Sequence, residues 1–173
     1  MKQAELVIIA GINGAGKTTF YQQNQQRFNR FTYVSADEFL RKMHGNWRKS
    51  DDQIKALLQT DAAIRKLINQ QINIVYEVNL GGNARSLIKI MDLAHSMQYS
   101  VTVVEIRIRD AALAVKRILH RFKAGGFGAD PALIIKRFTK LESDFAELEQ
   151  MVDRVIKFDN TQRLSGVIDF NYY

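Results

Sequence analysis

Short apolar runs alternate along this chain with longer segments whose apolar residues recur every three or four positions. The apolar runs predict five strands, at residues 6–10, 31–35, 72–78, 101–108 and 152–158. The segments with helical spacing predict helices at about 17–27, 36–43, 52–69, 84–97 and 111–123, and a further helix opened by Asp130 and Pro131. This alternation indicates an α/β protein with a mostly parallel five-stranded sheet and helices on both faces.

The strands and helices follow one another without a linker, a repeat or a low-complexity segment. We therefore expect one domain over residues 1–173. The last stretch, 163–173, alternates weakly between apolar and polar residues and predicts an edge strand or hairpin.

Residues 11–18 read Gly-Ile-Asn-Gly-Ala-Gly-Lys-Thr and follow the first apolar run directly. This is the G-x-x-x-x-G-K-[ST] pattern of a phosphate-binding loop, in which the turn points successive N–H groups at a nucleotide's phosphates. An ordinary strand-to-helix turn is the alternative, but the strand before it and the helix after it favour the phosphate loop and a three-layer P-loop NTPase fold. Lys17 is expected to reach the phosphates and Thr18 to hold Mg²⁺. The expected nucleotide-binding residues are Gly11, Asn13, Gly14, Ala15, Gly16, Lys17, Thr18 and Thr19.

Acidic residues follow the ends of other predicted strands. Because ligands of an open parallel sheet bind at the carboxyl ends of its strands, Asp37, Glu77 and Asp159 are candidates for one cleft. Asp37 is placed to orient or deprotonate an attacking hydroxyl, with a helix N-cap as the alternative. Glu77 interrupts an apolar run, and we expect it to bind substrate hydroxyls or to support Mg²⁺; an exposed strand-end charge is the alternative.

Basic residues gather between positions 107 and 140, in a chain of formal net charge +7. Arg117 and Arg121 lie one helical turn apart and share a face, and Gly125 and Gly126 follow as possible hinges. We expect a helical lid over about 117–137 that carries arginines onto the phosphates, with Arg137 joining from the next helix. A solvated helical face is the plainer interpretation.

Composition limits the remaining classes of function. The chain has no cysteine, which excludes disulfides, thiolate nucleophiles and cysteine-ligated metals. Its apolar runs are far shorter than the roughly 20 residues of a membrane span, and the first run leads into a glycine loop rather than a cleavage site. These features predict a cytoplasmic protein without a membrane partner. Nucleic acid is a weaker candidate partner, because no aromatic residues are interleaved with the basic ones for base stacking.

Five stretches, in order, resemble the zeta-toxin-like P-loop kinases. They are VIIAGINGAGKTTF, FTYVSADEF, VYEVNLGGNAR, VKRILHRFKAGGFGADPALIIKRF and VIKFDNT, and they span most of the chain up to Thr161. The resemblance implies ATP as donor, catalytic roles for Lys17, Asp37, Arg117 and Arg121, and substrate binding by Asp37, Glu77 and Arg137. Arg121 is the best match to the family's lid arginine.

Toxins of this group resemble kinases that phosphorylate UDP-N-acetylglucosamine. The present chain has Val78 and Phe127 where the group commonly has threonine and histidine. The sequence thus predicts an ATP-dependent kinase acting on a hydroxyl of a small anionic acceptor, such as a nucleotide sugar. A nucleoside, a sugar acid or an RNA end remains an alternative acceptor, and a nucleotide-dependent nucleic-acid-binding module is an alternative function. The toxin resemblance also raises an antitoxin protein as a partner.

Overall fold

All five predicted strands form in the computed structural model, which describes residues 3–82 and 85–162. The strands are β1 (Glu5–Gly11), β2 (Thr32–Ser35), β3 (Ile74–Asn79), β4 (Ser100–Arg107) and β5 (Arg154–Asp159). They form one sheet in the order β2-β3-β1-β4-β5, in which every neighbouring pair is parallel. The predicted fold class is therefore confirmed, and the part of the sheet that the structure describes is entirely parallel.

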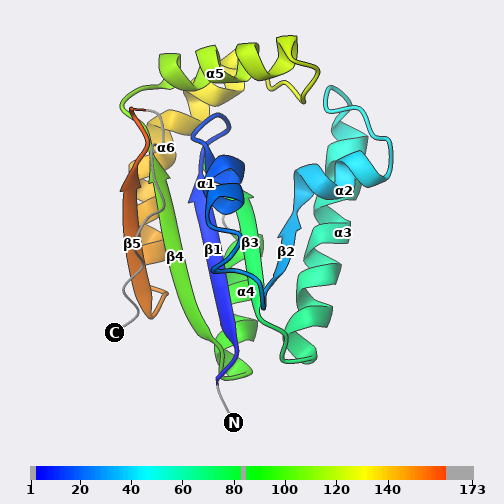
Figure 1. The fold of residues 1–173 in the computed structure, drawn as a ribbon, viewed down its shortest axis with the longest axis vertical. Coiled ribbons are helices and arrows are strands. Elements are labelled where there is room, and N and C mark those ends of the chain that lie inside the picture. The colour runs from blue at the N-terminus through cyan, green and yellow to red at the C-terminus, as the bar shows by residue number, and fades with distance from the viewer. Residues whose placement is uncertain (1–2, 83–84, 163–173) are drawn as a thin grey trace.

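Six helices connect these strands (Figure 1). They are α1 (Lys17–Gln23), α2 (Ala36–Lys42), α3 (Ser50–Asn69), α4 (Arg85–Ser96), α5 (Ala111–Lys123) and α6 (Pro131–Glu149). Helix α1 lies in front of the sheet, α4 and α6 lie behind it, and α3 packs against β2, β3 and α4. Helix α5 runs across the top of the sheet, and the connection after β1 lies beneath it.

Strand β1 is the centre of the fold because both of its faces are covered. Its register places Ile8 between Tyr76 of β3 and Val103 of β4. Ile8 is completely buried, as are its neighbours Leu6 and Ile9. An uninterrupted apolar run suits this place, since a strand covered on both sides has no face that needs polar residues.

Helix α1 is shorter than predicted, ending at Gln23 rather than near residue 27. The cause is Asn24, whose side-chain Nδ2 donates to the carbonyl oxygen of Phe20 at 2.8 Å. That bond competes with continued helix formation, as asparagine side chains commonly do. A series of turns follows, including Arg27 N–H to Asn24 O at 2.9 Å.

Two further expectations concern the C-terminal stretch and membrane-spanning helices. The predicted edge strand or hairpin at 163–173 lies outside the described residues. None of the helices within 3–82 and 85–162 combines the length and apolarity that a bilayer span requires.

Candidate functional site

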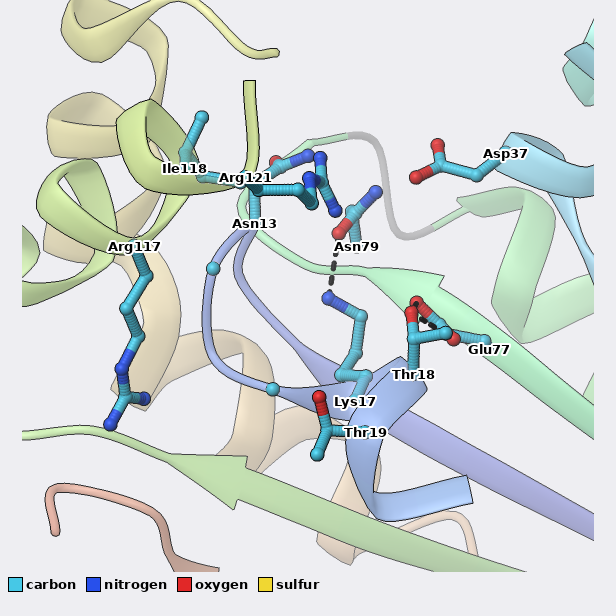
Figure 2. Close-up of a pocket in the computed structure, with 12 residues that line it drawn as sticks. Asn13, Lys17, Thr18, Thr19, Asp37, Glu77, Asn79, Arg117, Ile118 and Arg121 are labelled. Atoms are coloured by element: carbon cyan, nitrogen blue, oxygen red, sulfur yellow. Dashed lines mark hydrogen bonds between the residues drawn. The ribbon is translucent and has the colours of Figure 1, made fainter. Parts of the chain in front are cut away.

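A cleft of about 310 Å³ opens at the carboxyl ends of β1, β2 and β3, beneath α5 (Figure 2). Its lining comes from the loop after β1, from the start of α1, from α2, from the end of β3 and from α5. The lining residues are Asn13, Gly14, Gly16, Lys17, Thr18, Thr19, Asp37, Glu77, Asn79, Arg117, Ile118 and Arg121.

The loop after β1 has the tight geometry that its glycines predict. Gly14 has a φ of +83°, and a Cβ added there would lie 2.6 Å from the carbonyl oxygen of Ala114 in α5. Only glycine combines this backbone angle with so close an approach. The loop is thereby packed directly against the first turns of α5.

Lys17 is 4% exposed and extends along the floor of the cleft. Its ammonium group donates to Ile12 O at 2.9 Å and to Asn79 Oδ1 at 2.7 Å. Burial lowers the pKa of Lys17 from its ordinary value of 10.5 to about 8, although the nearby Glu77 and Asp37 carboxylates favour the charged form. Because burial outweighs these carboxylates, an anionic ligand that brings further negative charge to the ammonium would stabilise its charged form.

Glu77 brings together two hydroxyl groups beside the lysine. The Thr18 hydroxyl lies 3.0 Å from each of the two Glu77 carboxylate oxygens, and the Tyr33 hydroxyl donates to Oε2. Burial, followed by the Glu77 charge, raises the pKa of Tyr33 well above its usual range, so Tyr33 stays a donor. Glu77 is buried, which is inconsistent with an exposed strand-end charge.

The same three side chains offer hard oxygen atoms next to the phosphate loop. Mg²⁺ prefers such ligands and commonly binds through one or two protein groups together with phosphate oxygens. The Thr18 hydroxyl and the Glu77 carboxylate therefore fit a magnesium site in chemical type. No group of three or more histidine and acidic side chains suited to a metal by itself occurs in the described ranges.

Asp37 faces the loop from the opposite side of the cleft, where α2 begins (Figure 2). The N-cap of α2 is Ser35, whose hydroxyl accepts from the Glu38 N–H at 3.2 Å. Since Ser35 fills the capping position, the Asp37 carboxylate points into the cleft rather than closing the helix end.

Two arginines of α5 line the cleft from above, and each is also held by a backbone carbonyl. Arg117 donates to Asn160 O at 2.7 Å, next to the end of β5. Arg121 donates through Nε to Phe127 O at 2.7 Å, in the connection between α5 and α6. Arg121 points toward Asn13 and Asn79, whereas Arg117 points toward the β5 side (Figure 2). The two arginines therefore serve different parts of the cleft.

Arg137 lies behind the cleft lining. Its Nη1 donates to Asn13 Oδ1 at 2.6 Å, which links α6 to the phosphate loop. Burial lowers the pKa of Arg137 below its ordinary value, and the Asp37 charge acts in the opposite direction. Arg137 is thus close enough to influence the cleft electrostatically without forming its wall.

The basic residues of the stretch 107–140 lie in three different environments. Arg107 pairs with Glu105 and Glu142, and Arg109 pairs with Asp110. Two other arginines line the cleft and a third lies behind its lining, as described above. The exposed cations that remain on α5 and α6 are Lys116, Lys123, Lys136 and Lys140. The arginines of this stretch are therefore engaged in ion pairs or lie near the cleft, and the exposed positive charge of α5 and α6 comes from these lysines.

The structure brings most of the predicted site residues together. Three predicted residues do not line the cleft: Gly11 packs toward Ile106 O, the Ala15 carbonyl accepts from Asn160 Nδ2 at 2.6 Å, and Arg137 lies behind the wall. Asp159, also a candidate, is exposed and accepts from the Thr161 N–H at 2.8 Å instead.

Sequence reasoning missed Asn79 and Tyr33. Asn79 lies two positions after Glu77 on β3, so the two side chains share a face of the strand. Applying the strand-end rule to that face would have found Asn79. Tyr33 carried no such signal, because a tyrosine in a short strand usually indicates packing.

A phosphate loop after the central strand of a parallel sheet, with a helix across the strand ends, defines a P-loop kinase fold. A family model for zeta toxin matches residues 1–170. This chain therefore belongs to the zeta toxin family. Family membership and fold together support a nucleotide-dependent kinase.

Solved structures share this fold at low sequence identity. A chain of the PezAT chromosomal toxin–antitoxin system of Streptococcus pneumoniae matches with a TM-score of 0.70 and 18% identity, over 92% of this chain and 69% of that one. A chain of the Pnkp1/Rnl/Hen1 RNA repair complex gives 0.69 and 19%, over 85% and 47%. Shikimate kinase from Acinetobacter baumannii gives 0.57 and 15%, over 90% and 84%. A search of curated protein sequences gave no match.

Proposed function

We propose that this chain transfers the γ-phosphate of ATP to a hydroxyl group of a small anionic acceptor, with a nucleotide sugar such as UDP-N-acetylglucosamine as the first candidate. The observation that carries the proposal is the composition of the cleft. Lys17 lies on the loop side, Asp37 faces it across the cleft from α2, and Arg121 lines the cleft from α5. Phosphoryl transfer needs these three parts: a donor cradle, a carboxylate for the attacking hydroxyl, and a cation for the migrating charge.

On the donor side, the N–H groups of the loop and the Lys17 ammonium bind the β- and γ-phosphates. The Thr18 hydroxyl, supported by Glu77, holds Mg²⁺, which when bound neutralises charge on the phosphate oxygens. The bond between Thr18 and Glu77 supports this role, because it fixes the hydroxyl beside Lys17. Thr19 follows the same loop into α1 and lines the donor side.

On the acceptor side, Asp37 accepts the proton of the attacking hydroxyl. Arg121 and Arg117 bind the phosphate oxygens as negative charge moves from donor to acceptor. Glu77 and Arg137 contribute to acceptor binding, Glu77 through a hydroxyl contact and Arg137 through its charge. The bond from Arg137 to Asn13 supports that assignment, since Asn13 lines the cleft and the bond holds the guanidinium next to the cleft wall.

The choice of acceptor rests on the zeta toxin family and not on the fold. Shikimate kinase shares the fold and is named for a different acceptor. Nucleosides, sugar acids and RNA 5′ ends therefore remain alternatives within the same mechanism. Because the PezAT neighbour is a toxin–antitoxin system, the proposal includes an antitoxin protein as a partner. The proposed place of action is the cytoplasm, as the sequence predicts.

The test is a phosphate-transfer screen with purified protein, Mg²⁺ and γ-labelled ATP. UDP-sugars, nucleosides, sugar acids and RNA with a 5′-hydroxyl are offered separately, and products are identified by mass spectrometry. We expect one class to gain a phosphate with the wild type and none to gain it with Lys17→Ala. Equal results for both proteins across all acceptor classes would refute kinase activity at this cleft. Salt-sensitive binding to RNA without transfer would favour the nucleic-acid-binding alternative.

A further inference from the structure

The connection between α2 and α3 lies near the end of α5 (Figure 1), and side chains of the two segments are in contact. Trp47 of this connection meets Phe122 of α5 edge to face, with ring centroids 5.8 Å apart and planes at 74°. The Arg48 guanidinium lies over both rings, 4.1 Å from the Trp47 centroid and 5.0 Å from that of Phe122. We refer to these three side chains as the latch. Aromatic pairs and cation–π contacts of this geometry are mutually attractive.

The latch continues into the α5–α6 connection. A Cβ added to Gly128 would lie 2.5 Å from Cζ2 of Trp47, so the indole rests directly on that backbone. The Arg41 guanidinium lies 5.6 Å from the ring centroid of Phe127. Two segments that are distant in the sequence thus pack together at this point.

The same connection holds Arg121 in place. The carbonyl oxygen of Phe127, in this connection, accepts from Arg121 Nε at 2.7 Å. A Cβ added to Gly126 would lie 2.8 Å from Cγ of Arg121, which shows how closely the backbone follows that side chain. Arg121 lines the cleft, whereas Trp47 and Arg48 do not.

We infer that Trp47 and Arg48 are positioning residues for Arg121, because they hold the α5–α6 connection against the α2–α3 connection and so fix Arg121 above the acceptor. Helix α2 carries Asp37 into the same cleft, and the latch therefore sets Asp37 and Arg121 opposite each other. This inference rests on the proposed function. According to this inference, the contacts of the latch close the cleft. Closing an active site in this way excludes water and completes the set of catalytic groups.

The first experiment is a double-mutant cycle on phosphate transfer. We expect Arg48→Ala to lower kcat about tenfold, as loss of a few such contacts would, while the Kd for Mg·ATP stays within about twofold. Lys49→Ala removes the exposed charge of the residue that follows Arg48 and should leave kcat unchanged. In an Arg121→Ala background, Arg48→Ala should cause no further loss of kcat. If Arg48 acts through Arg121, the effects of the two substitutions are not additive. Fully additive losses, with melting temperatures unchanged, would overturn the inference.

The second experiment does not require turnover. Trp47 is the chain's one tryptophan, so its fluorescence reports the latch directly. Saturating Mg·ATP should reduce acrylamide quenching of Trp47 in the wild type, and this protection should be lost in Arg121→Ala. Trp47→Phe should retain most of the kcat that Trp47→Ala loses, because phenylalanine keeps a ring against Phe122.

The two experiments separate the inference from the proposed function. Nucleotide-dependent protection of Trp47 that needs Arg121, without transfer to any acceptor, would support the latch and reject the kinase. Transfer by the wild type with quenching that is unaffected by Mg·ATP, when calorimetry shows that nucleotide is bound, would retain the kinase and reject the latch.

Discussion

The Lys17 ammonium donates to Asn79 Oδ1 at 2.7 Å, although 62 positions separate the two residues in the chain. Asn79 is the last residue of β3, and Glu77 stands two positions before it on the same face. The lysine of the phosphate loop is therefore oriented by the neighbouring strand as well as by its own loop. A loop lysine held in this way is already extended along the cleft before a ligand arrives.

Lys17 should give the free protein an unusual dependence of stability on pH. Its pKa is about 8 in the folded chain, against 10.5 for an ordinary lysine. Between these pH values the unfolded chain binds more protons, so the free energy of unfolding should rise as pH increases from about 8 to 10.5. The full shift corresponds to about 3 kcal/mol, at about 1.36 kcal/mol per unit. Urea unfolding at a series of pH values measures this change.

Lys17→Met is the control for that titration, since it keeps much of the side chain and removes the proton. The rise above pH 8 should be absent in the variant. Bound phosphates favour the charged lysine, so the wild type's affinity for Mg·ATP should be constant below about pH 8 and fall above it. Identical pH profiles for the wild type and Lys17→Met would contradict the assignment.

Asp37→Asn should abolish most phosphate transfer while leaving the fold intact. The amide keeps the size of the side chain but cannot take the proton of the acceptor hydroxyl. We expect kcat to fall by about 10²- to 10⁴-fold, the usual contribution of a general base. Because Ser35, not Asp37, caps α2, the melting temperature should change little. Steady-state kinetics and thermal unfolding measure the two quantities.

Glu38 provides the matched control for Asp37. It is the adjacent carboxylate, it pairs with Lys42 at 3.5 Å, and it does not line the cleft. Glu38→Gln should leave kcat within about twofold of the wild type, as for a weak surface pair. A similar loss of kcat in both variants would mean that α2, rather than the Asp37 carboxylate, is what the reaction requires.

The sequence predicted the parts of this protein that local pattern controls. The apolar run 6–10 became the doubly covered β1, and the glycine pattern placed Lys17 and Thr18 at its end. Asp37 and Glu77 followed from one topological rule, that the carboxyl ends of parallel strands share an edge. The sheet and the family model confirm the fold class and the family, while the chemical roles of these residues stay predictions.

Other features depend on side-chain directions that sequence spacing does not determine. The early end of α1 results from one asparagine bonding back to Phe20. Arg117 and Arg121 share a helical face, yet different carbonyl partners point them to different parts of the cleft. The latch needs Trp47 and Phe122 to meet across 75 positions of chain, and nothing in either local sequence indicates that contact.

Gly81 should be far less tolerant of substitution than Gly82. Gly81 has a φ of +83°, and a Cβ there would lie 2.4 Å from the Cβ of Arg137 and 2.5 Å from its Cα. Its N–H also donates to the buried Asp144 at 2.6 Å. We expect Gly81→Ala to cost about 2 kcal/mol or more through backbone strain and displacement of α6. Gly82→Ala meets no atom within 4 Å and should cost less than about 0.5 kcal/mol. Equal melting temperatures for the two variants would show that α6 does not press on this turn.

Arg107 and Arg109 offer the same substitution in two environments. Arg107 pairs at 2.8 Å with the completely buried Glu105, while Arg109 is 71% exposed and pairs with Asp110 at the surface. Arg107→Met leaves a buried carboxylate without its main partner, and we expect a loss of about 3–5 kcal/mol. Arg109→Met removes only an exposed surface pair and should cost far less. Chemical unfolding of both variants tests the difference.

The loss in Arg107→Met should also depend on pH. Burial raises the pKa of Glu105, and removing the adjacent guanidinium raises it further. Above the ordinary glutamate pKa of 4.5 the folded variant then binds more protons than the unfolded chain, so its stability should fall as pH increases from that value. Adding Glu105→Gln should recover most of the stability, because the amide carries no charge to bury. If the double variant is as unstable as Arg107→Met, the loss comes instead from the stacking of Arg107 on Phe145, where the guanidinium lies 4.6 Å from the ring centroid.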